Sequence, residues 1–142
     1  MYDVVIVGAG PAGISAALYA KRANINVIVL YKDESTVSEA HKIDNFYGFP
    51  GGITGEDLYL NGIEQAKQLG VEVKKTEVVG IENLGAHFNV KTDRGNFEGE
   101  AVILSTGNKK LKPNIAGVAE FEGKGISYCA ICDAFFYRNK NV

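Results

Sequence analysis

A glycine-rich turn between two short apolar runs constrains the fold of this chain more than any other feature. Residues 4–7 (VVIV) are apolar and β-branched, as in a buried parallel strand. Residues 8–13 (GAGPAG) interrupt that run, and residues 11 to about 23 predict a helix that starts at Pro11, where no amide donor is needed. A second apolar run over residues 26–31 completes a strand–helix–strand unit, which predicts a right-handed, parallel crossover.

The spacing Gly8-x-Gly10-x-x-Gly13 predicts a dinucleotide-binding loop. In such a loop the first glycine permits a tight turn, the second lets a pyrophosphate approach the backbone, and the third lets the helix pack on the strand. The helix N-terminus then offers free amides and a positive dipole to the phosphates. The alternative is a glycine turn that serves packing alone, and the strand–turn–helix context favours the dinucleotide site.

The end of the second strand lacks the acidic residue that usually holds the ribose hydroxyls of a dinucleotide. Tyr31 stands there instead, and it is followed by Lys32, Asp33 and Glu34. Asp33 would reach the ribose after a small shift of the turn, and Tyr31 would stack on the nucleotide. The alternative is that all four are ordinary loop residues. We favour a ligand role for this segment, with Tyr31 and Lys32 as its candidates.

After this unit the sequence predicts a long irregular segment and then a second helix. Residues 32–55 show no periodic pattern, and Thr54 with Asp57 predicts the N-terminal cap of a helix over residues 55–69. Gly70 is a natural stop for that helix. Its expected apolar face consists of Leu58, Ile63, Ala66 and Leu69.

Several short strands are expected beyond the second helix. One begins at residues 71–74, residues 78–81 and 88–92 form a meander that turns at residues 93–95, and residues 101–105 form another buried run. The aromatic residues of the irregular segment are expected to fill the core beneath it; they are Phe46, Tyr47 and Phe49. The pattern predicts an α/β domain with three layers, a parallel sheet and a β-meander.

Composition limits the compartment and the partners of the chain. The 142 residues carry a net charge of −2, which gives no electrostatic footprint for nucleic acid. No apolar stretch approaches the roughly 20 residues that span a bilayer, and residues 1–3 (MYD) begin no basic leader segment. We therefore expect a cytoplasmic protein without a membrane partner, in which a stable structural disulfide is disfavoured.

The two cysteines stand together as Cys129-x-x-Cys132, and Asp133 follows them directly. Two intervening residues let both sulfurs meet across one helical turn, and Asp133 would carry the proton that moves when a dithiol opens or closes. A zinc site lacks ligands, because His41 and His87 are the other candidates and their spacing does not suit zinc. Two buried, inert cysteines are a further alternative. The co-occurrence with a dinucleotide loop favours a redox pair.

Three segments together resemble the low-molecular-weight thioredoxin reductase family. They are the glycine loop, residues 103–107 (ILSTG) and, most specifically, residues 127–137 (SYCAICDAFFY). In that family the N-terminal segment builds an FAD-binding, Rossmann-like domain. An inserted pyridine-nucleotide domain carries the redox cysteines near its start. The resemblance, which covers essentially the whole chain, implies an FAD/NAD(P)-binding fold over residues 1–113 and the start of the second domain over residues 114–142.

The resemblance also implies roles for individual residues. Cys129 and Cys132 would form the redox-active disulfide, and Asp133 would be the acid beside it. The residues implied at the cofactor are Gly8, Gly10, Pro11, Ala12 and Gly13 at the FAD pyrophosphate, Asn45 near the flavin, and Thr106 and Gly107 where the FAD strand ends. Electrons would pass from NADPH to FAD, to the disulfide, and on to thioredoxin or a similar small protein. We expect a homodimer for the complete protein.

Departures from the family's pattern leave the electron donor open. Tyr31 replaces the acid after the second strand, and residues 35–40 (STVSEA) replace a glycine-glycine-glutamine stretch next to the flavin. No nicotinamide-binding glycine motif occurs within the 142 residues, so a site for NADPH is not expected in this chain. Atypical relatives use reduced ferredoxin or a second flavin. A stand-alone FAD-binding module without turnover is the alternative from another class of function.

Overall fold

The structure is a computed structural model in which the chain forms two compact units, Met1–Asn108 and Lys109–Val142. It describes residues 1–108, 111, 113–122, 124–128 and 134–141. The second unit contains a short helix, α3 (Val118–Phe121), and a 3-10 helix, η2 (Ala134–Tyr137). Across the ranges that the structure describes, no helix has the length and apolar character needed to cross a bilayer.

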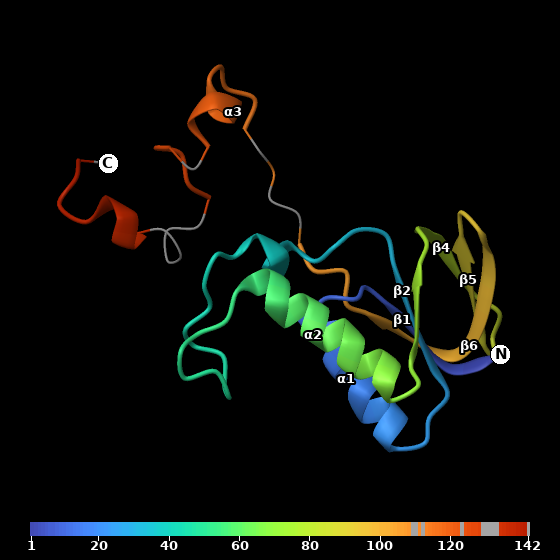
Figure 1. The fold of residues 1–142 in the computed structure, drawn as a ribbon. Helices are drawn as coiled ribbons and strands as arrows, with labels where there is room; N and C mark the ends of the chain where they lie inside the picture. Colours follow the sequence, from blue (N-terminus) through green and yellow to red (C-terminus); the bar gives the residue numbers. More distant parts are fainter. Residues whose placement is uncertain (109–110, 112, 123, 129–133, 142) are drawn as a thin grey trace. The chain divides into compact units, whose positions relative to one another are not determined.

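The first unit is built on one six-stranded sheet with the order β3-β2-β1-β6-β5-β4 (Figure 1). Its strands are β1 (Tyr2–Val7), β2 (Val27–Tyr31), β3 (Glu72–Lys75), β4 (Val78–Asn83), β5 (Phe88–Thr92) and β6 (Gly95–Leu104). β3, β2, β1 and the second half of β6 are parallel, whereas β4, β5 and the first half of β6 form an antiparallel meander. The predicted parallel sheet with a β-meander is confirmed.

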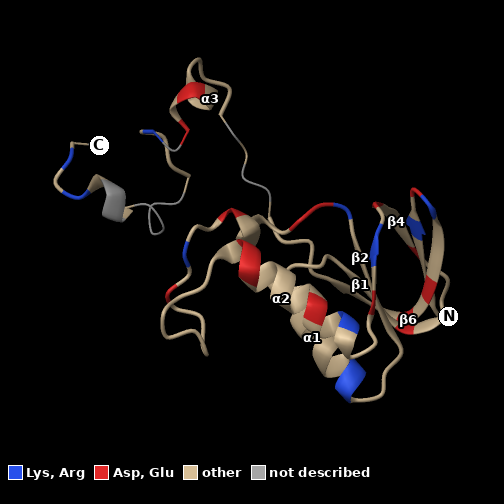
Figure 2. Cartoon of the chain, in the orientation of Figure 1, with Lys and Arg blue, Asp and Glu red and all other residues tan. Residues whose placement is uncertain are grey.

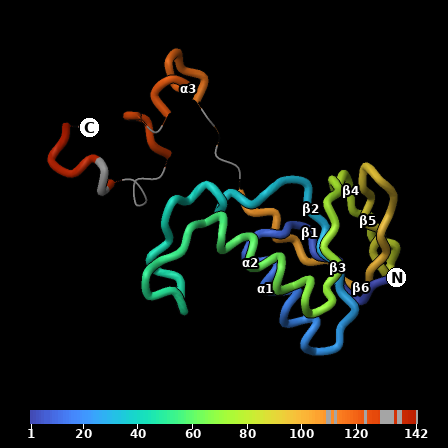
Figure 3. The backbone as a smooth tube through the Cα atoms, viewed as in Figure 1, coloured from blue at the N-terminus to red at the C-terminus, as the bar shows by residue number. Residues whose placement is uncertain are grey.

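β6 belongs to both parts of the sheet because it changes partner at Gly99. This residue pairs with Phe88 of β5 on one side and with Tyr2 of β1 on the other. A Cβ atom at Gly99 would lie 2.8 Å from Cγ2 of Val5, so a side chain does not fit where the strands cross. The long strand therefore carries the chain from the meander back to the parallel part of the sheet, where it lies beside β1 (Figure 3).

Two apolar clusters on opposite faces of the parallel sheet give the unit three layers. On one face, α1 (Pro11–Arg22) and α2 (Gly55–Gln68) cover a cluster that includes Ile6 and Val29. On the other face, Val90 of the meander packs into a cluster with Ile28 and other β-strand residues. Alternate side chains of each strand thus enter different clusters, as the pleat requires.

The sequence predicted most helix and strand positions well, and Thr54 caps α2 as expected. Its hydroxyl accepts a hydrogen bond from the amide of Asp57 at 3.0 Å. The predicted apolar face of this helix was wrong at one residue. Leu69 lies at the C-terminal cap and is 43% exposed, whereas Tyr59 turns inward and is 6% exposed. Tyr59 belongs to the buried cluster with Ile14 of α1, because burying a large aromatic ring stabilises the fold more than its place in the periodic pattern suggests.

The prediction that residues 101–105 form a buried run was also wrong. Ile103 and Leu104 are exposed, although their strand pairs with β1. β5 pairs only with residues 95–99 of β6, so within the described residues the second half of β6 has a strand on one side only. An apolar, β-branched sequence indicates a strand, but its burial depends on neighbours that the local pattern does not specify.

Candidate functional site

The glycine loop (residues 8–13) joins β1 to α1 and is shaped by close backbone packing. Gly8 has a φ of +112°, a conformation that favours glycine. A Cβ atom there would collide with the carbonyl oxygen of Ser105, and one at Gly13 would collide with the carbonyl oxygen of Gly8. The first and third glycines are therefore required by the packing of strand on helix, as the spacing predicts.

The N-terminus of α1 is an open site for an anion. Gly10 is the N-cap residue, no side chain caps the helix, and the first turn contains no acidic residue. The described part of the chain offers no acceptor to the amides of Ala9, Gly10 and Ala12. The basic side chains of Lys21 and Arg22 lie at the opposite end, in the last turn (Figure 2). Free amides and the helix dipole together favour a phosphate group beside Gly10, Pro11 and Ala12.

Ser105 forms the floor of this loop. Its hydroxyl lies 3.0 Å from the carbonyl oxygens of Val7 and Gly8, and its amide donates to Val7 at 2.8 Å. Ser105 was not among the site residues predicted from the sequence. The available signal was a polar residue directly after a predicted strand, because the carboxyl ends of parallel strands meet at one edge of the sheet.

The structure brings Thr106 and Gly107 to the same edge of the sheet as the glycine loop. Leu104, the last residue of β6, is paired with Val7, the last residue of β1. Both Thr106 and Gly107 are exposed, and Gly107 has a φ of +66°. The chain thus turns sharply where it leaves β6, beside the open end of α1.

The carboxyl end of β2 presents a lysine in an ion pair. The Nζ atom of Lys32 lies 2.8 Å from Oε1 of Glu77, and this hydrogen bond raises the pKa of the lysine. Tyr31 is half-buried and packs against the apolar cluster beneath α1 and α2. Asp33 and Glu34 are exposed. The structure therefore brings Lys32 together with an acid, Glu77, that lies 45 residues further along the chain.

Asn45 lies on an exposed loop whose ends are held together. Ile43 and Ile53 pair across its base, with hydrogen bonds of 2.8 and 3.0 Å. Within the loop, Tyr47 is 98% exposed and Phe46 is 46% exposed, so the prediction that the aromatic residues fill the core was wrong for these two. The loop projects from the body of the first unit, and the core beneath it is already filled by side chains of α1 and α2 (Figure 1).

A cavity of about 170 Å³ lies between this loop and the two helices. Phe49 lines it from the loop, Ile14 from α1 and Leu58 from α2. Ala9 and Pro11 of the glycine loop also reach the cavity. The open end of α1 therefore borders an apolar hollow on the side of the loop that carries Asn45.

The predicted redox residues, Cys129, Cys132 and Asp133, lie outside the described residues. Described residues flank them on both sides, with Tyr128 before the gap and η2 beginning at Ala134 after it. The redox role of the cysteine pair therefore stays a prediction from the sequence.

Comparisons with known proteins agree with this geometry. The family model for pyridine nucleotide-disulphide oxidoreductases matches residues 2–142. The thioredoxin reductase of Treponema pallidum (strain Nichols) is 41% identical over 144 residues, which cover 99% of this chain and 47% of that protein. The crystal structure of thioredoxin reductase from Streptococcus pyogenes MGAS5005 is similar, with a TM-score of 0.85 at 35% identity, over 96% of this chain and 45% of that one.

A ferredoxin-flavin thioredoxin reductase from Clostridium acetobutylicum is also similar in structure, with a TM-score of 0.69 at 34% identity. The match covers 96% of this chain and 48% of that one. The chain thus spans about half the length of the curated relatives it matches. With the glycine loop, the open N-terminus of α1 and a family match over residues 2–142, the chain belongs to the pyridine nucleotide-disulphide oxidoreductase family and is similar to thioredoxin reductases.

Proposed function

We propose that this chain supplies the FAD-binding segment and the redox cysteines of a flavin-dependent disulfide reductase. The observation that carries the proposal is the open first turn of α1, with its free amides beside Gly10, in a chain whose relatives are thioredoxin reductases. Such a helix end is suited to the pyrophosphate of a dinucleotide. We extend the FAD-binding domain to residue 113 and assign residues 114–142 to the start of a second domain.

The residues at the glycine loop fit FAD. Gly8, Gly10, Pro11, Ala12 and Gly13 would hold the pyrophosphate, since the first turn of α1 contains no acidic residue and the amides of Gly10 and Ala12 have no acceptor among the described residues. Thr106 and Gly107 would flank the cofactor from β6, and Asn45 would approach the flavin from the loop that borders the apolar cavity. Tyr31 and Lys32 would lie at the ribose end. When bound, FAD supplies the two electrons that open a disulfide.

Cys129 and Cys132 would carry those electrons onward. Two electrons and two protons convert the Cys129–Cys132 disulfide to two thiols, and Asp133 would transfer one of the protons. One thiolate then attacks the disulfide of the partner protein and forms a mixed disulfide. The second cysteine displaces the partner as a dithiol and restores the Cys129–Cys132 disulfide. Thioredoxin or a similar small disulfide protein would be the partner, in the cytoplasm, with the complete enzyme a homodimer.

The electron donor would be NADPH, reduced ferredoxin or a second flavin. NADPH is the donor implied by the family resemblance, and its site would lie outside this chain. A relative named as a ferredoxin-flavin thioredoxin reductase supports the second candidate. A test is to mix the complete, FAD-loaded protein anaerobically with each donor and to follow the flavin absorbance. The donor that bleaches the flavin band is the one in use, and a second-flavin variant would respond to neither.

A stand-alone FAD-binding module is the alternative function, and a separate experiment distinguishes it from a reductase. The purified chain is incubated with FAD and passed through a gel-filtration column, and retained flavin shows binding. Dithiothreitol is then added anaerobically. Bleaching of the flavin through the cysteine pair supports the reductase, whereas retained flavin that dithiothreitol does not reduce favours the module. A chain that retains no flavin contradicts both readings for this segment.

A further inference from the structure

We propose that Glu77 is the residue that binds the ribose hydroxyls of the adenosine half of the cofactor. The inference rests on the proposed function, because it assumes a dinucleotide at the glycine loop. In this class of fold the ribose lies at the carboxyl end of β2, where an acidic side chain accepts its hydroxyls. Lys32 follows β2 in this chain, so the acid is a residue further along the chain, either Asp33 or Glu34 or one that the fold brings to this position.

The structure places Glu77 at that edge of the sheet. β3 runs parallel to β2, with Lys75 paired with Tyr31. The amide of Thr76 also donates to the carbonyl oxygen of Tyr31 at 2.8 Å, so the two strands stay together to their carboxyl ends. One residue later, the carboxylate of Glu77 meets the Nζ atom of Lys32 at 2.8 Å. An acid from the link between β3 and β4 therefore lies beside the residue that follows β2.

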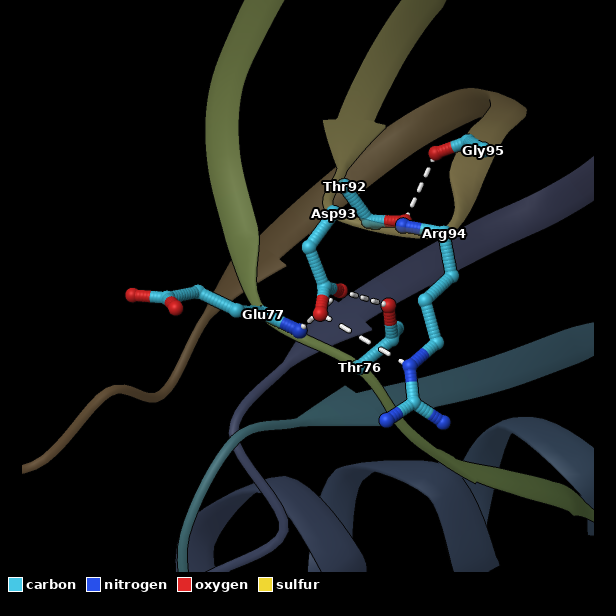
Figure 4. Close-up of polar contacts among 6 residues, drawn as sticks. All are labelled: Thr76, Glu77, Thr92, Asp93, Arg94 and Gly95. Atoms are coloured by element: carbon cyan, nitrogen blue, oxygen red, sulfur yellow. Dashed lines mark hydrogen bonds and ion pairs between the residues drawn. The ribbon is translucent and has the colours of Figure 1, made fainter.

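The backbone of Glu77 is fixed by the turn between β5 and β6. Its amide donates to Oδ1 of Asp93 at 2.9 Å, and its carbonyl oxygen accepts from the amide of Asp93 at 3.0 Å. The hydroxyl of Thr76, which is 3% exposed, also donates to Oδ1 of Asp93. Figure 4 shows the side chain of Glu77 extending away from this cluster, so its carboxylate takes no part in these contacts. The acid is held in place but is open to a ligand.

The carboxylate has acceptor capacity to spare. Its Oε1 atom contacts Lys32, and the structure gives Oε2 no hydrogen-bond partner among the described residues. An ionised carboxylate has about four acceptor sites, which suffices for a lysine and the two hydroxyls of a ribose. The side chain of Glu77 is 44% exposed, so a ribose can reach it. The ion pair with Lys32 limits the motion of this side chain.

Asp33 and Glu34 are the other acids that could bind the ribose hydroxyls, and they differ from Glu77 in how firmly their side chains are held. Both are exposed, and neither forms a side-chain hydrogen bond within the part of the chain that the structure describes. A free side chain loses rotamer entropy when it binds a ligand, whereas Glu77 is already ordered by Lys32. Asp33 therefore serves as the matched control, because it is an acid of the same charge next to Lys32.

The test compares two changes, one in the protein at Glu77 and one in the ribose of the ligand. The complete protein without its cofactor is titrated with FAD and with an FAD analogue that has deoxyadenosine in place of adenosine, and binding is followed by flavin fluorescence. The wild type should bind FAD roughly tenfold more tightly than the analogue, as expected for a hydrogen bond to a charged group. Glu77→Gln exchanges the charged acceptor for a weaker, neutral amide oxygen, so it should reduce that preference by weakening FAD binding alone. Asp33→Asn should keep it.

Each other outcome contradicts the inference. If Glu77→Gln weakens FAD and the analogue by the same factor, Glu77 acts on the fold and not on the ribose. If Asp33→Asn abolishes the preference, Asp33 is the ribose acceptor. If the wild type binds FAD and Glu77→Gln binds it equally well, this inference alone is wrong. If the wild type binds no FAD, the proposed function is wrong as well.

Discussion

The hydroxyl of Ser105 lies 3.0 Å from the carbonyl oxygen of Gly8, although 97 residues separate them in the sequence. The C=O and N–H groups of a trans peptide point in opposite directions. A hydrogen bond that fixes the Gly8 carbonyl toward Ser105 therefore turns the amide of Ala9 to the opposite side, away from β6. Ser105 thus ties the end of β6 to the orientation of the first free amide of the glycine loop.

Replacing Ser105 with alanine should weaken both the fold and the anion site. The Gly8 carbonyl loses its hydroxyl partner, while Val7 keeps the amide of Ser105. We expect the free energy of unfolding to fall by about 1 kcal/mol, with weaker FAD binding, since a partly buried acceptor loses its hydroxyl donor. Urea denaturation and FAD titration measure the two effects. Ser15→Ala, at an exposed position of α1, is the control, and equal behaviour of the two variants would contradict the role given to Ser105.

Two helical glycines should respond to alanine in opposite directions. A Cβ atom at Gly13 would collide with the backbone of Gly8, so Gly13→Ala should cost about 2 kcal/mol or more and abolish FAD retention. A Cβ atom at Gly62 of α2 would lie 3.5 Å from Ile14, an ordinary contact. Gly62→Ala should therefore stabilise the fold by roughly 0.5–1 kcal/mol. Thermal unfolding of both variants tests the pair, and a tolerated Gly13→Ala would show that the loop packs less closely than described.

Asp93 should make the fold less stable in acid. The hydrogen bond from Thr76 and then the one from the amide of Glu77 lower the pKa of Asp93 in the folded state. Because the folded pKa is below the unfolded one, the stabilisation is present above about pH 4 and is lost as the pH falls through the folded pKa. Urea unfolding over a series of acidic pH values should show a shallower decline for Asp93→Asn than for the wild type. Parallel curves for the two proteins would contradict this assignment.

What the sequence predicted well depends on near neighbours along the chain. The turn at Gly8, the start of α1 at Pro11 and the cap at Thr54 are each set by residues within one helical turn. The exposed Tyr47 was mispredicted because aromatic residues usually lie in the core, whereas this one stands on a closed loop outside it. Local patterns thus identified the elements and the glycine loop.

The parts of the candidate site that the sequence did not reveal come from strand pairing. Ser105 reaches Val7 because β6 pairs with β1, and Glu77 reaches Lys32 because β3 pairs with β2. These contacts join residues 98 and 45 positions apart. A single sequence does not specify which strands become neighbours, so the floor of the glycine loop and the acid beside Lys32 became visible only in the folded sheet.

Under the proposed function, electrons leave the flavin through Cys129 and Cys132. The most direct measurement uses the complete, FAD-loaded protein, in which the flavin is reduced anaerobically with dithionite and then mixed with oxidised thioredoxin. This design does not depend on the natural donor. We predict rapid return of the flavin absorbance in the wild type. A Cys129→Ser, Cys132→Ser variant with the same FAD content should stay reduced, and reoxidation of that variant as fast as the wild type would contradict the account.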